Sequence, residues 1–329
     1  MAFVLQRKIG LISFLEKTMK YLKLIRLENL LLIAGIQYSF GYGFIRASLP
    51  AVALSHFEFA LLVLATLCLT AGAYVMNDIQ DVGTDEINKT KKVIVNHSVT
   101  ENTAFNLYIG LNIFGVVLAF YLSNLVGKPN LTGIFILVAL TFYFYANQLK
   151  NIFLVGLLIK VLLSGLIILV LPLYEIYPLI DESNQTEYAT LLKVMVDFAI
   201  LTILLNLTRE ILKDLASKNG DYNEGYPTLP TVLGTKRTHF LSLILVLTMV
   251  ILVSLYTYFY LWINNLYIAT AYNLAFVLTP FIFVLIQLFS NQKDKEYLKM
   301  SKMLKYILLF ACFSIVIITY TIAHEIKTL

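Results

Sequence analysis

Long apolar stretches alternate with short polar connections along the whole chain. Nine of these stretches are apolar enough to cross a hydrocarbon core as helices, which takes about 20 residues each. They cover residues 27–45, 57–76, 104–126, 131–147, 152–173, 191–208, 239–263, 267–290 and 304–323. Isolated strands cannot satisfy their backbone groups in lipid. The pattern therefore predicts an all-α, polytopic membrane protein, a bundle of nine transmembrane helices with loops capping its cytoplasmic side.

The composition agrees with a membrane protein. Of the 329 residues, 59% are hydrophobic and 14% are charged, and the mean hydropathy is +0.79. These values lie outside the range of soluble domains. The net charge of +5 comes from basic residues between the spans, so no nucleic-acid partner is expected. No linker divides the chain, and we predict one domain over residues 1–329 in which residues 1–26 form a basic amphipathic segment at the membrane surface.

The basic residues also predict the orientation. Most lysines and arginines lie in the N-terminal segment and in alternate connections, and only Arg46, Lys128 and Lys327 fall in the connections and terminus on the other side. By the positive-inside rule the N-terminus is cytoplasmic, and an odd number of spans puts the C-terminus outside. We therefore expect a multi-pass protein of the cell (inner) membrane whose two longest cytoplasmic connections, near 77–103 and 209–238, hold its polar chemistry.

Two acidic motifs, one in each of those connections, share the same spacing. Their members occupy relative positions 0, 3 and 7: Asp78, Asp81 and Asp85 in the first, and Asp214, Ser217 and Asp221 in the second. On a helix these offsets lie on one face. Mg²⁺ prefers oxygen ligands and usually takes one or two carboxylates together with substrate phosphate oxygens. We therefore predict that the five aspartates hold Mg²⁺ around a diphosphate and are the catalytic residues, because bound metal neutralises the charge of the leaving diphosphate.

Cations and an amide accompany the acids. Arg209 and Lys213 lie one turn apart beside the second motif, while Asn77 opens the first motif and Lys89 and Lys92 follow it. Arginine suits bidentate contacts with phosphate, and lysine suits point-charge contacts. We predict that these five residues bind the diphosphate.

The two motifs resemble the signatures of the UbiA superfamily of intramembrane prenyltransferases. The first signature, N-D-x-x-D-x-x-x-D, is present in full from Asn77 to Asp85. The second resembles R-E-x-x-K-D-x-x-D-x-x-x-D from Arg209 onwards, except that Ser217 replaces the expected acid. With serine at this position, either one metal ligand is weaker or a water molecule supplies it. This second signature is most similar to members of the digeranylgeranylglyceryl phosphate synthase type. The resemblance extends to a Gly…Thr-Leu-Pro…Gly tail at Gly225, Thr228-Leu229-Pro230 and Gly234, and to acceptor or prenyl pocket positions at Arg26, Asn29, Tyr145 and Lys150.

The resemblance implies a Mg²⁺-dependent transferase that moves a polyprenyl group from its diphosphate to an acceptor within the bilayer. Two acceptor classes stay open: a lipid such as geranylgeranylglyceryl phosphate, and an aromatic ring as in quinone, tocopherol-like or haem biosynthesis. A membrane transporter is the alternative from another class, but transporters usually place their key charges at midplane in broken helices. CDP-alcohol phosphotransferases need a D-G-x-x-A-R element, which this sequence lacks.

Two charges fall inside predicted spans. Lys160 and Asp197 both lie near the expected midplane, where an unpaired charge is costly. We predict that they form an ion pair, so that Lys160→Met and Asp197→Leu are each more damaging than the double change.

Overall fold

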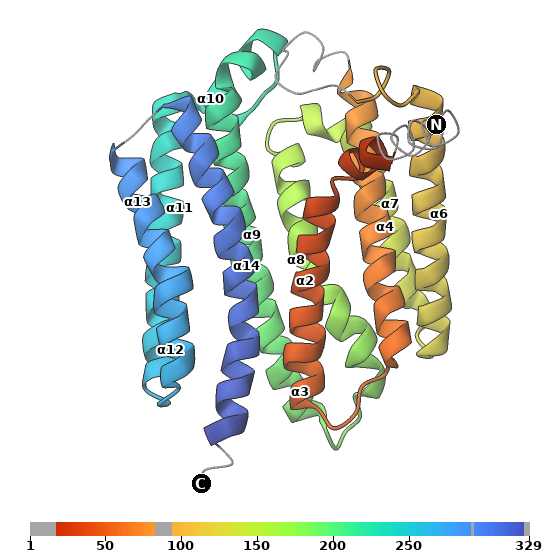
Figure 1. Cartoon of the computed structure of the whole chain (residues 1–329), viewed down its shortest axis with the longest axis vertical. Helices are drawn as coiled ribbons and strands as arrows, with labels where there is room; N and C mark the ends of the chain where they lie inside the picture. The colour runs from red at the N-terminus through yellow and green to blue at the C-terminus, as the bar shows by residue number, and fades with distance from the viewer. Residues whose placement is uncertain (1–17, 83–93, 291–292, 326–329) are drawn as a thin grey trace, which may run out of the picture. The chain divides into compact units, whose positions relative to one another are not determined.

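The computed structural model describes residues 18–82, 94–290 and 293–325 (Figure 1). Within these ranges the regular elements are helices, apart from a single bridge between Val95 and Val99. The longer helices are α2 (Leu27–Phe40), α4 (His56–Gln80), α6 (Glu101–Leu125), α7 (Thr132–Asn147), α8 (Val155–Glu175), α9 (Gln185–Glu224), α11 (Thr235–Tyr256), α12 (Tyr267–Asn273), α13 (Thr279–Ser290) and α14 (Asp294–Glu325). Shorter elements are α3 (Arg46–Ser48) and α10 (Leu229–Leu233), the π-helical turns η1 (Gly41–Ile45), η5 (Thr257–Trp262) and η6 (Leu274–Leu278), and the 3₁₀ turns η2 (Pro129–Leu131), η3 (Leu149–Asn151) and η4 (Tyr177–Leu179).

The predicted all-α membrane fold is confirmed, with a small difference in the count of spans. In the described part of the chain, eight helices are long and apolar enough to cross a membrane. They correspond to the second through ninth predicted spans. The first predicted span, 27–45, is helical too, but α2 has only 14 residues before η1 and α3 continue it.

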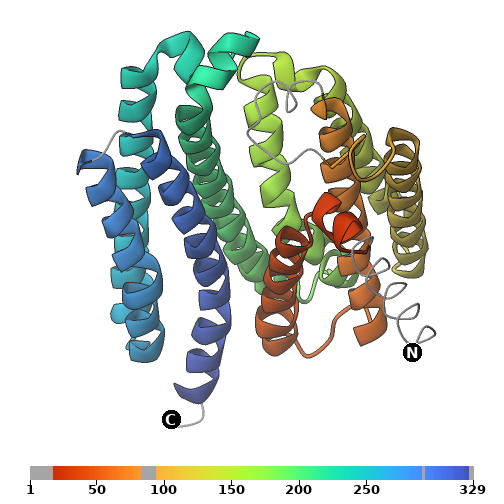
Figure 2. The same ribbon diagram turned by 45° about the horizontal axis from the view of Figure 1, so that its top comes forward.

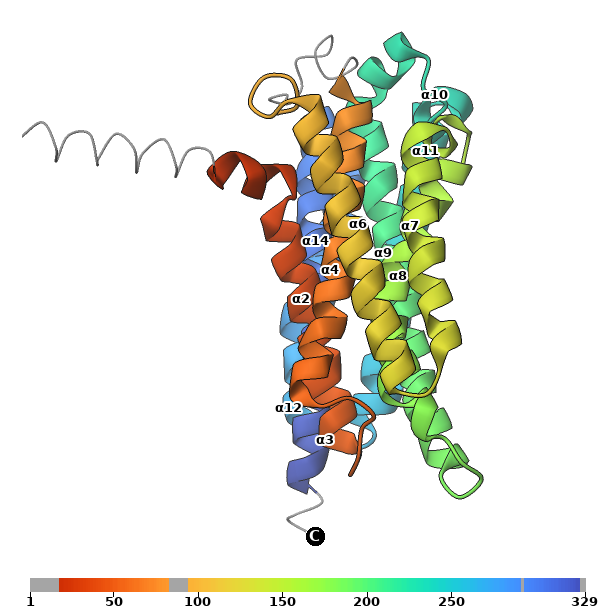
Figure 3. The same ribbon diagram turned by 90° about the vertical axis from the view of Figure 1, so that its right-hand side faces the viewer.

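The chain groups into two compact units. The first consists of residues 1–34 and 56–147, and the second of residues 35–55 and 148–329. In the first unit α4 packs against α6, which runs beside it in Figure 3, and also against α7. Buried apolar side chains at the end of α4, among them Val75 and Met76, pack with Val95, Val99 and Tyr108. This cluster fixes the end of α4, where the first acidic motif begins. The single-domain organisation expected from the sequence stays a prediction.

In the second unit α9 is the central helix and packs against α8, α11 and α14, the last running beside it in Figure 2. It has 40 residues, which corresponds to about 60 Å and is roughly twice the length that crosses a hydrocarbon core. The apolar stretch ends near residue 208, so the helix carries the second acidic motif well beyond it.

The predicted ion pair between Lys160 and Asp197 is wrong. The Lys160 ammonium instead lies 3.5 Å from Oε2 of Glu210. Thirteen residues separate Asp197 from Glu210 on the same helix, about 20 Å along its axis. The register of the α8–α9 contact explains the difference: a Cβ on Gly165 would lie 2.7 Å from Ile203. In this antiparallel register, residue 160 faces the turn around Glu210, whereas counting from predicted span ends put it level with Asp197.

A buried ion pair fastens the connection between α3 and α4 to the end of α8. Arg46 Nη2 donates to Glu175 Oε1 at 2.6 Å and to the carbonyl oxygen of Leu54 at 2.8 Å. The other carboxylate oxygen of Glu175 accepts from the backbone N–H of Leu54, and its carbonyl accepts from Ala53. The Glu175 side chain is fully buried. Every oxygen of this buried carboxylate therefore has a donor.

Candidate active site

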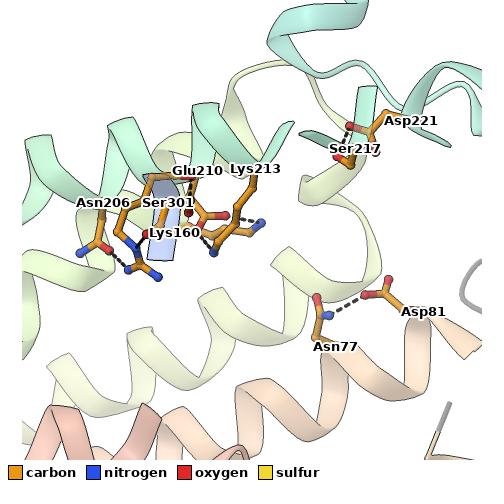
Figure 4. Close-up of polar contacts among 10 residues, drawn as sticks. Asn77, Asp81, Lys160, Asn206, Glu210, Lys213, Ser217, Asp221 and Ser301 are labelled. Atoms are coloured by element: carbon orange, nitrogen blue, oxygen red, sulfur yellow. Dashed lines mark hydrogen bonds and ion pairs between the residues drawn. The ribbon is translucent and has the colours of Figure 1, made fainter. Parts of the chain in front are cut away.

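The first acidic motif ends α4, in the first unit. Asn77 and Asp78 lie in the last turn of this helix, and Asp81 follows it. The Asn77 side-chain amide donates to Oδ2 of Asp81 at 2.5 Å, one turn on (Figure 4). Arg26 Nη2 donates to Asp78 Oδ1 at 2.6 Å, and its guanidinium lies 4.8 Å from the centre of the Tyr74 ring. The structure thus places Arg26, a predicted pocket residue, in contact with Asp78, a predicted metal ligand.

Arg26 reaches Asp78 from a turn that precedes α2. Its φ of 52° lies in the left-handed region, which costs a non-glycine residue free energy unless its surroundings hold it there. Its carbonyl oxygen accepts from the backbone N–H of Asn29 in the first turn of α2. Arg26, Asn29 and Asp78 are therefore linked as one local structure, although Asp78 lies 52 residues after Arg26 in the sequence.

The other residues predicted for the first motif and for the acceptor or prenyl pocket fall elsewhere. Asp85, Lys89 and Lys92 lie outside the described residues. Tyr145 is partly buried near the end of α7 in the first unit, whereas Lys150 belongs to η3 in the second unit. A Cβ on Gly156 would lie 2.8 Å from the Lys150 Cα, so glycine at the start of α8 lets the backbone of η3 pack closely against it.

The second acidic motif lies on one face of α9. Ile211, Leu212 and Leu215 are buried against neighbouring helices, while Asp214 and Asp221 are only partly buried. The apolar positions recur at the three- and four-residue intervals of a helix. The predicted shared face for the acids follows directly from this pattern.

Asp221 is held by two hydroxyl groups. Ser217 Oγ donates to its Oδ2 at 2.9 Å, and the side chain of Thr228 also hydrogen-bonds to it. The residue that replaces the expected acid is therefore a donor to the next acid of the motif (Figure 4). This matches the first motif, where Asn77 donates to the acid four residues later.

The tail after the second motif turns the chain back so that Thr228 reaches Asp221. Gly225 ends α9 at φ 74°, and Gly234 separates α10 from α11 at φ 87°; both conformations favour glycine. Between them the side chains of Thr228 and Thr231 form a capping box that starts α10, with Pro230 in its first turn.

Arg209 is fixed by α14 and by its own helix. Its Nη1 donates to Asn206 Oδ1 at 2.6 Å, and its Nε donates to the carbonyl oxygen of Ser301 at 3.4 Å. The Ser301 hydroxyl donates in return to the carbonyl oxygen of Arg209 at 3.1 Å. Sequence reasoning missed Asn206 and Ser301. The amide one turn before Arg209 was a usable signal, but nothing in the sequence marks Ser301.

Glu210 lies between two lysines. Its Oε1 is 2.5 Å from the Lys213 ammonium, and its Oε2 is 3.5 Å from that of Lys160 on α8 (Figure 4). Asp214 follows in the next turn. The predicted phosphate residue Lys213 therefore belongs to a charged cluster to which α8 contributes a second ammonium.

Within the described ranges, no three His, Cys, Asp or Glu side chains gather closely enough to hold a metal ion by themselves. The donors of each motif nevertheless fit Mg²⁺. Asp78 and Asp81 in the first unit, and Asp214 and Asp221 in the second, offer carboxylate oxygens. Mg²⁺ needs only one or two of these when phosphate oxygens and water complete its coordination. A diphosphate would bring those oxygens.

Replacement of Ser217 tests whether its hydrogen bond orients Asp221. Ser217→Ala removes the donor while the carboxylate remains, and we expect kcat/KM to fall about tenfold because Asp221 gains rotational freedom. Steady-state assays at several Mg²⁺ concentrations measure this. Ser254→Ala is the matched control, since that hydroxyl donates to the carbonyl oxygen of Val250 on its own helix, α11. Equal activity of the two variants would exclude an orienting role.

Comparison with known proteins gives consistent matches. The model of the UbiA prenyltransferase family matches residues 42–306. The digeranylgeranylglyceryl phosphate synthase of Sulfurisphaera tokodaii is 28% identical over 281 residues, which cover 85% of this chain and 92% of the relative. The enzyme of the same name from Methanobrevibacter smithii is 28% identical over 275 residues, with coverages of 80% and 87%.

Solved structures share the fold. A structure of digeranylgeranylglyceryl phosphate synthase aligns with a TM-score of 0.60 at 24% identity, over 92% of this chain and 99% of that one. A UbiA homologue from Archaeoglobus fulgidus bound to GPP and Mg²⁺ aligns with a TM-score of 0.57 at 15% identity, over 90% and 99%. At these identities the likeness establishes the architecture.

Proposed function

The chain belongs to the UbiA prenyltransferase family and is an integral membrane prenyltransferase, and we propose on this premise that it alkylates a glycerophosphate lipid with a polyprenyl diphosphate. The observation that carries the proposal is that the curated relatives named above are digeranylgeranylglyceryl phosphate synthases and align over most of the chain. The basic side chains beside the second motif support it, because a phosphorylated acceptor adds charge that these cations can bind.

We propose that the acids of both motifs, Asp78, Asp81, Asp85, Asp214 and Asp221, act on the same diphosphate through Mg²⁺. The UbiA homologue bound to GPP and Mg²⁺ supports a divalent cation and a prenyl diphosphate as ligands of this family. When bound, Mg²⁺ stabilises negative charge that develops on the leaving diphosphate. Asn77, Lys89, Lys92, Arg209 and Lys213 are proposed to hold the diphosphate oxygens.

The residues then have distinct tasks in the reaction. The allylic carbon–oxygen bond breaks, and its electron pair leaves with the diphosphate that Arg209 and Lys213 grip. The acceptor hydroxyl oxygen forms the new ether bond with the allylic carbon and releases its proton to the diphosphate. Ser217 and Thr228 keep Asp221 oriented, and Asn206 and Ser301 keep Arg209 oriented. Arg26, Asn29, Tyr145 and Lys150 are assigned to the acceptor or prenyl pocket.

A product assay tests the proposal. Purified protein is incubated with Mg²⁺, labelled geranylgeranyl diphosphate and either geranylgeranylglyceryl phosphate or a panel of aromatic acceptors. We expect a new ether of the glycerophosphate lipid, identified by its mass, and no product when EDTA removes the metal. Prenylation of an aromatic ring alone would exclude the glycerophosphate assignment. Ion flux in proteoliposomes without any prenyl transfer would favour the transporter class instead.

The predicted orientation carries over to this proposal. With the N-terminus cytoplasmic, both motifs face the compartment in which diphosphates are made. Cysteine accessibility measured from each side of the membrane tests it: a cysteine introduced at Tyr222, which is 75% exposed beside the second motif, should react only from the cytoplasmic side.

A further inference from the structure

Lys160 is a charge that the family signatures do not explain. It lies in α8 within the run Leu157–Leu163, where all other residues are aliphatic. An ammonium in such a run costs free energy in a membrane. A lysine that served only to set the orientation of the protein in the membrane would lie in a connection between spans. Its side chain is half exposed, and its Nζ is 3.5 Å from Glu210, whose other oxygen contacts Lys213. The two ammonium groups therefore lie close to one carboxylate of the second motif.

The charge of Lys160 also reaches the aspartates of that motif. It interacts electrostatically with Asp214 and with Asp221, both proposed metal ligands. Glu210, Lys213 and Asp214 are consecutive members of the partly buried face of α9, and Lys160 is the residue that α8 adds to them. The extra ammonium is thus placed among the groups proposed to surround the diphosphate.

We propose that Lys160 is a phosphate-binding residue of this active site, contributed by α8 and held in place by Glu210. The inference rests on the proposed function and extends it to a residue outside the signatures. With Asp214 and Asp221 assigned to Mg²⁺, Glu210 is the one carboxylate left for the two ammonium groups, and the resulting positive surplus would attract a phosphate group. An ammonium offers three donors without fixed geometry, so it can follow a phosphate that moves. That phosphate belongs either to the prenyl diphosphate or to the phosphorylated acceptor.

Kinetics of Lys160→Met distinguish the two sources. KM is measured for the prenyl diphosphate with acceptor saturating, and for geranylgeranylglyceryl phosphate with donor saturating. We expect one KM to rise about tenfold or more, because a charge-assisted hydrogen bond is lost, with a smaller change in kcat. Lys160→Arg keeps the charge and should recover most of the affinity. Lys193→Met makes the same chemical change on α9 about 25 Å from Glu210 along the helix, and should leave both KM values unchanged.

The KM values of Lys160→Met show which phosphate, if any, Lys160 contacts. A rise confined to the donor KM assigns Lys160 to the diphosphate, and a rise confined to the acceptor KM assigns it to the acceptor phosphate. Two unchanged KM values overturn the proposal and leave Lys160 as a structural partner of Glu210. Poor folding of Lys160→Met would show as a lowered melting temperature in detergent, and Lys160→Gln then takes its place, because it removes the charge while it keeps a hydrogen-bond donor for Glu210.

Failure of the proposed function itself would look different, because the wild-type protein would then make no prenylated product. Binding of inorganic diphosphate with Mg²⁺, measured by calorimetry, still tests Lys160 in that case. Tighter binding to wild type than to Lys160→Met supports a phosphate contact, and equal affinity contradicts it.

Discussion

Asp214→Ala is expected to reduce prenyl transfer by at least 100- to 1000-fold while the protein still inserts into the membrane and folds. Removal of one preorganised electrostatic contact to a developing negative charge costs about this much, and loss of Asp214 as the proposed metal ligand would remove more than one contact. Asp214 projects from the partly buried face of α9, whose packing depends on Ile211, Leu212 and Leu215 on the other face. The helix should therefore tolerate alanine at position 214.

Initial rates with labelled prenyl diphosphate measure the loss, and melting temperature in detergent checks the fold. Asp181→Ala is the matched control, since that aspartate lies on the exposed connection between α8 and α9 in the same unit. A variant with near wild-type rates would refute a role for Asp214 in metal binding.

Asp78→Ala should behave in the same way as Asp214→Ala. Arg26→Met removes the ion pair between Arg26 and Asp78 and leaves the carboxylate in place. Comparing the two variants therefore separates the proposed metal-binding role of Asp78 from its ion pair, because only Asp78→Ala should change how the rate depends on Mg²⁺ concentration.

Much of the fold and part of the site could be predicted because they depend on local pattern. Apolar length predicts membrane helices, and three- and four-residue spacing predicts that Asp214 and Asp221 share a face of α9. The turns at Gly225 and Gly234 follow from a conformation that glycine adopts readily. None of these inferences requires knowing which helix packs against which.

Three of the contacts that sequence reasoning missed join distant segments. The pairs are Arg26 with Asp78, Arg209 with Ser301, and Lys160 with Glu210. The last two depend on the register between two helices, where a shift of one turn moves a side chain by about 5 Å, and the first depends on where the turn at Arg26 lies beside α4. Lys160 shows the consequence: depth counted from span ends paired it with Asp197, whereas packing of Gly165 against Ile203 places it at Glu210. A charge inside an apolar run indicates that a partner exists, but not which one.

Glu175→Ala is expected to reduce stability strongly, because the Glu175 carboxylate is fully buried and accepts hydrogen bonds from Arg46 and Leu54. Glu175→Ala leaves the guanidinium of Arg46, a largely buried side chain, without its carboxylate, and it also removes an acceptor from the backbone N–H of Leu54. Breaking a buried ion pair by removing one partner costs about 3–5 kcal/mol of the free energy of unfolding. The double change Arg46→Met with Glu175→Met should be less damaging than Glu175→Ala, because no buried charge is left over.

Thermal unfolding in detergent measures the effect. The matched control is Glu187→Ala, at an exposed site in the first turn of α9. We expect it to change the free energy of unfolding by no more than about 0.5 kcal/mol. Glu175 and Lys160 are fifteen residues apart on α8, about 22 Å along the helix. The folded fraction of Glu175→Ala should therefore keep the wild-type KM for both substrates, while its melting temperature falls. Equal melting temperatures for the Glu175 and Glu187 variants would mean that the Arg46–Glu175 pair contributes nothing to the fold. A raised KM at unchanged stability would instead connect the end of α8 that carries Glu175 with substrate binding, which the contacts of that carboxylate give no reason to expect.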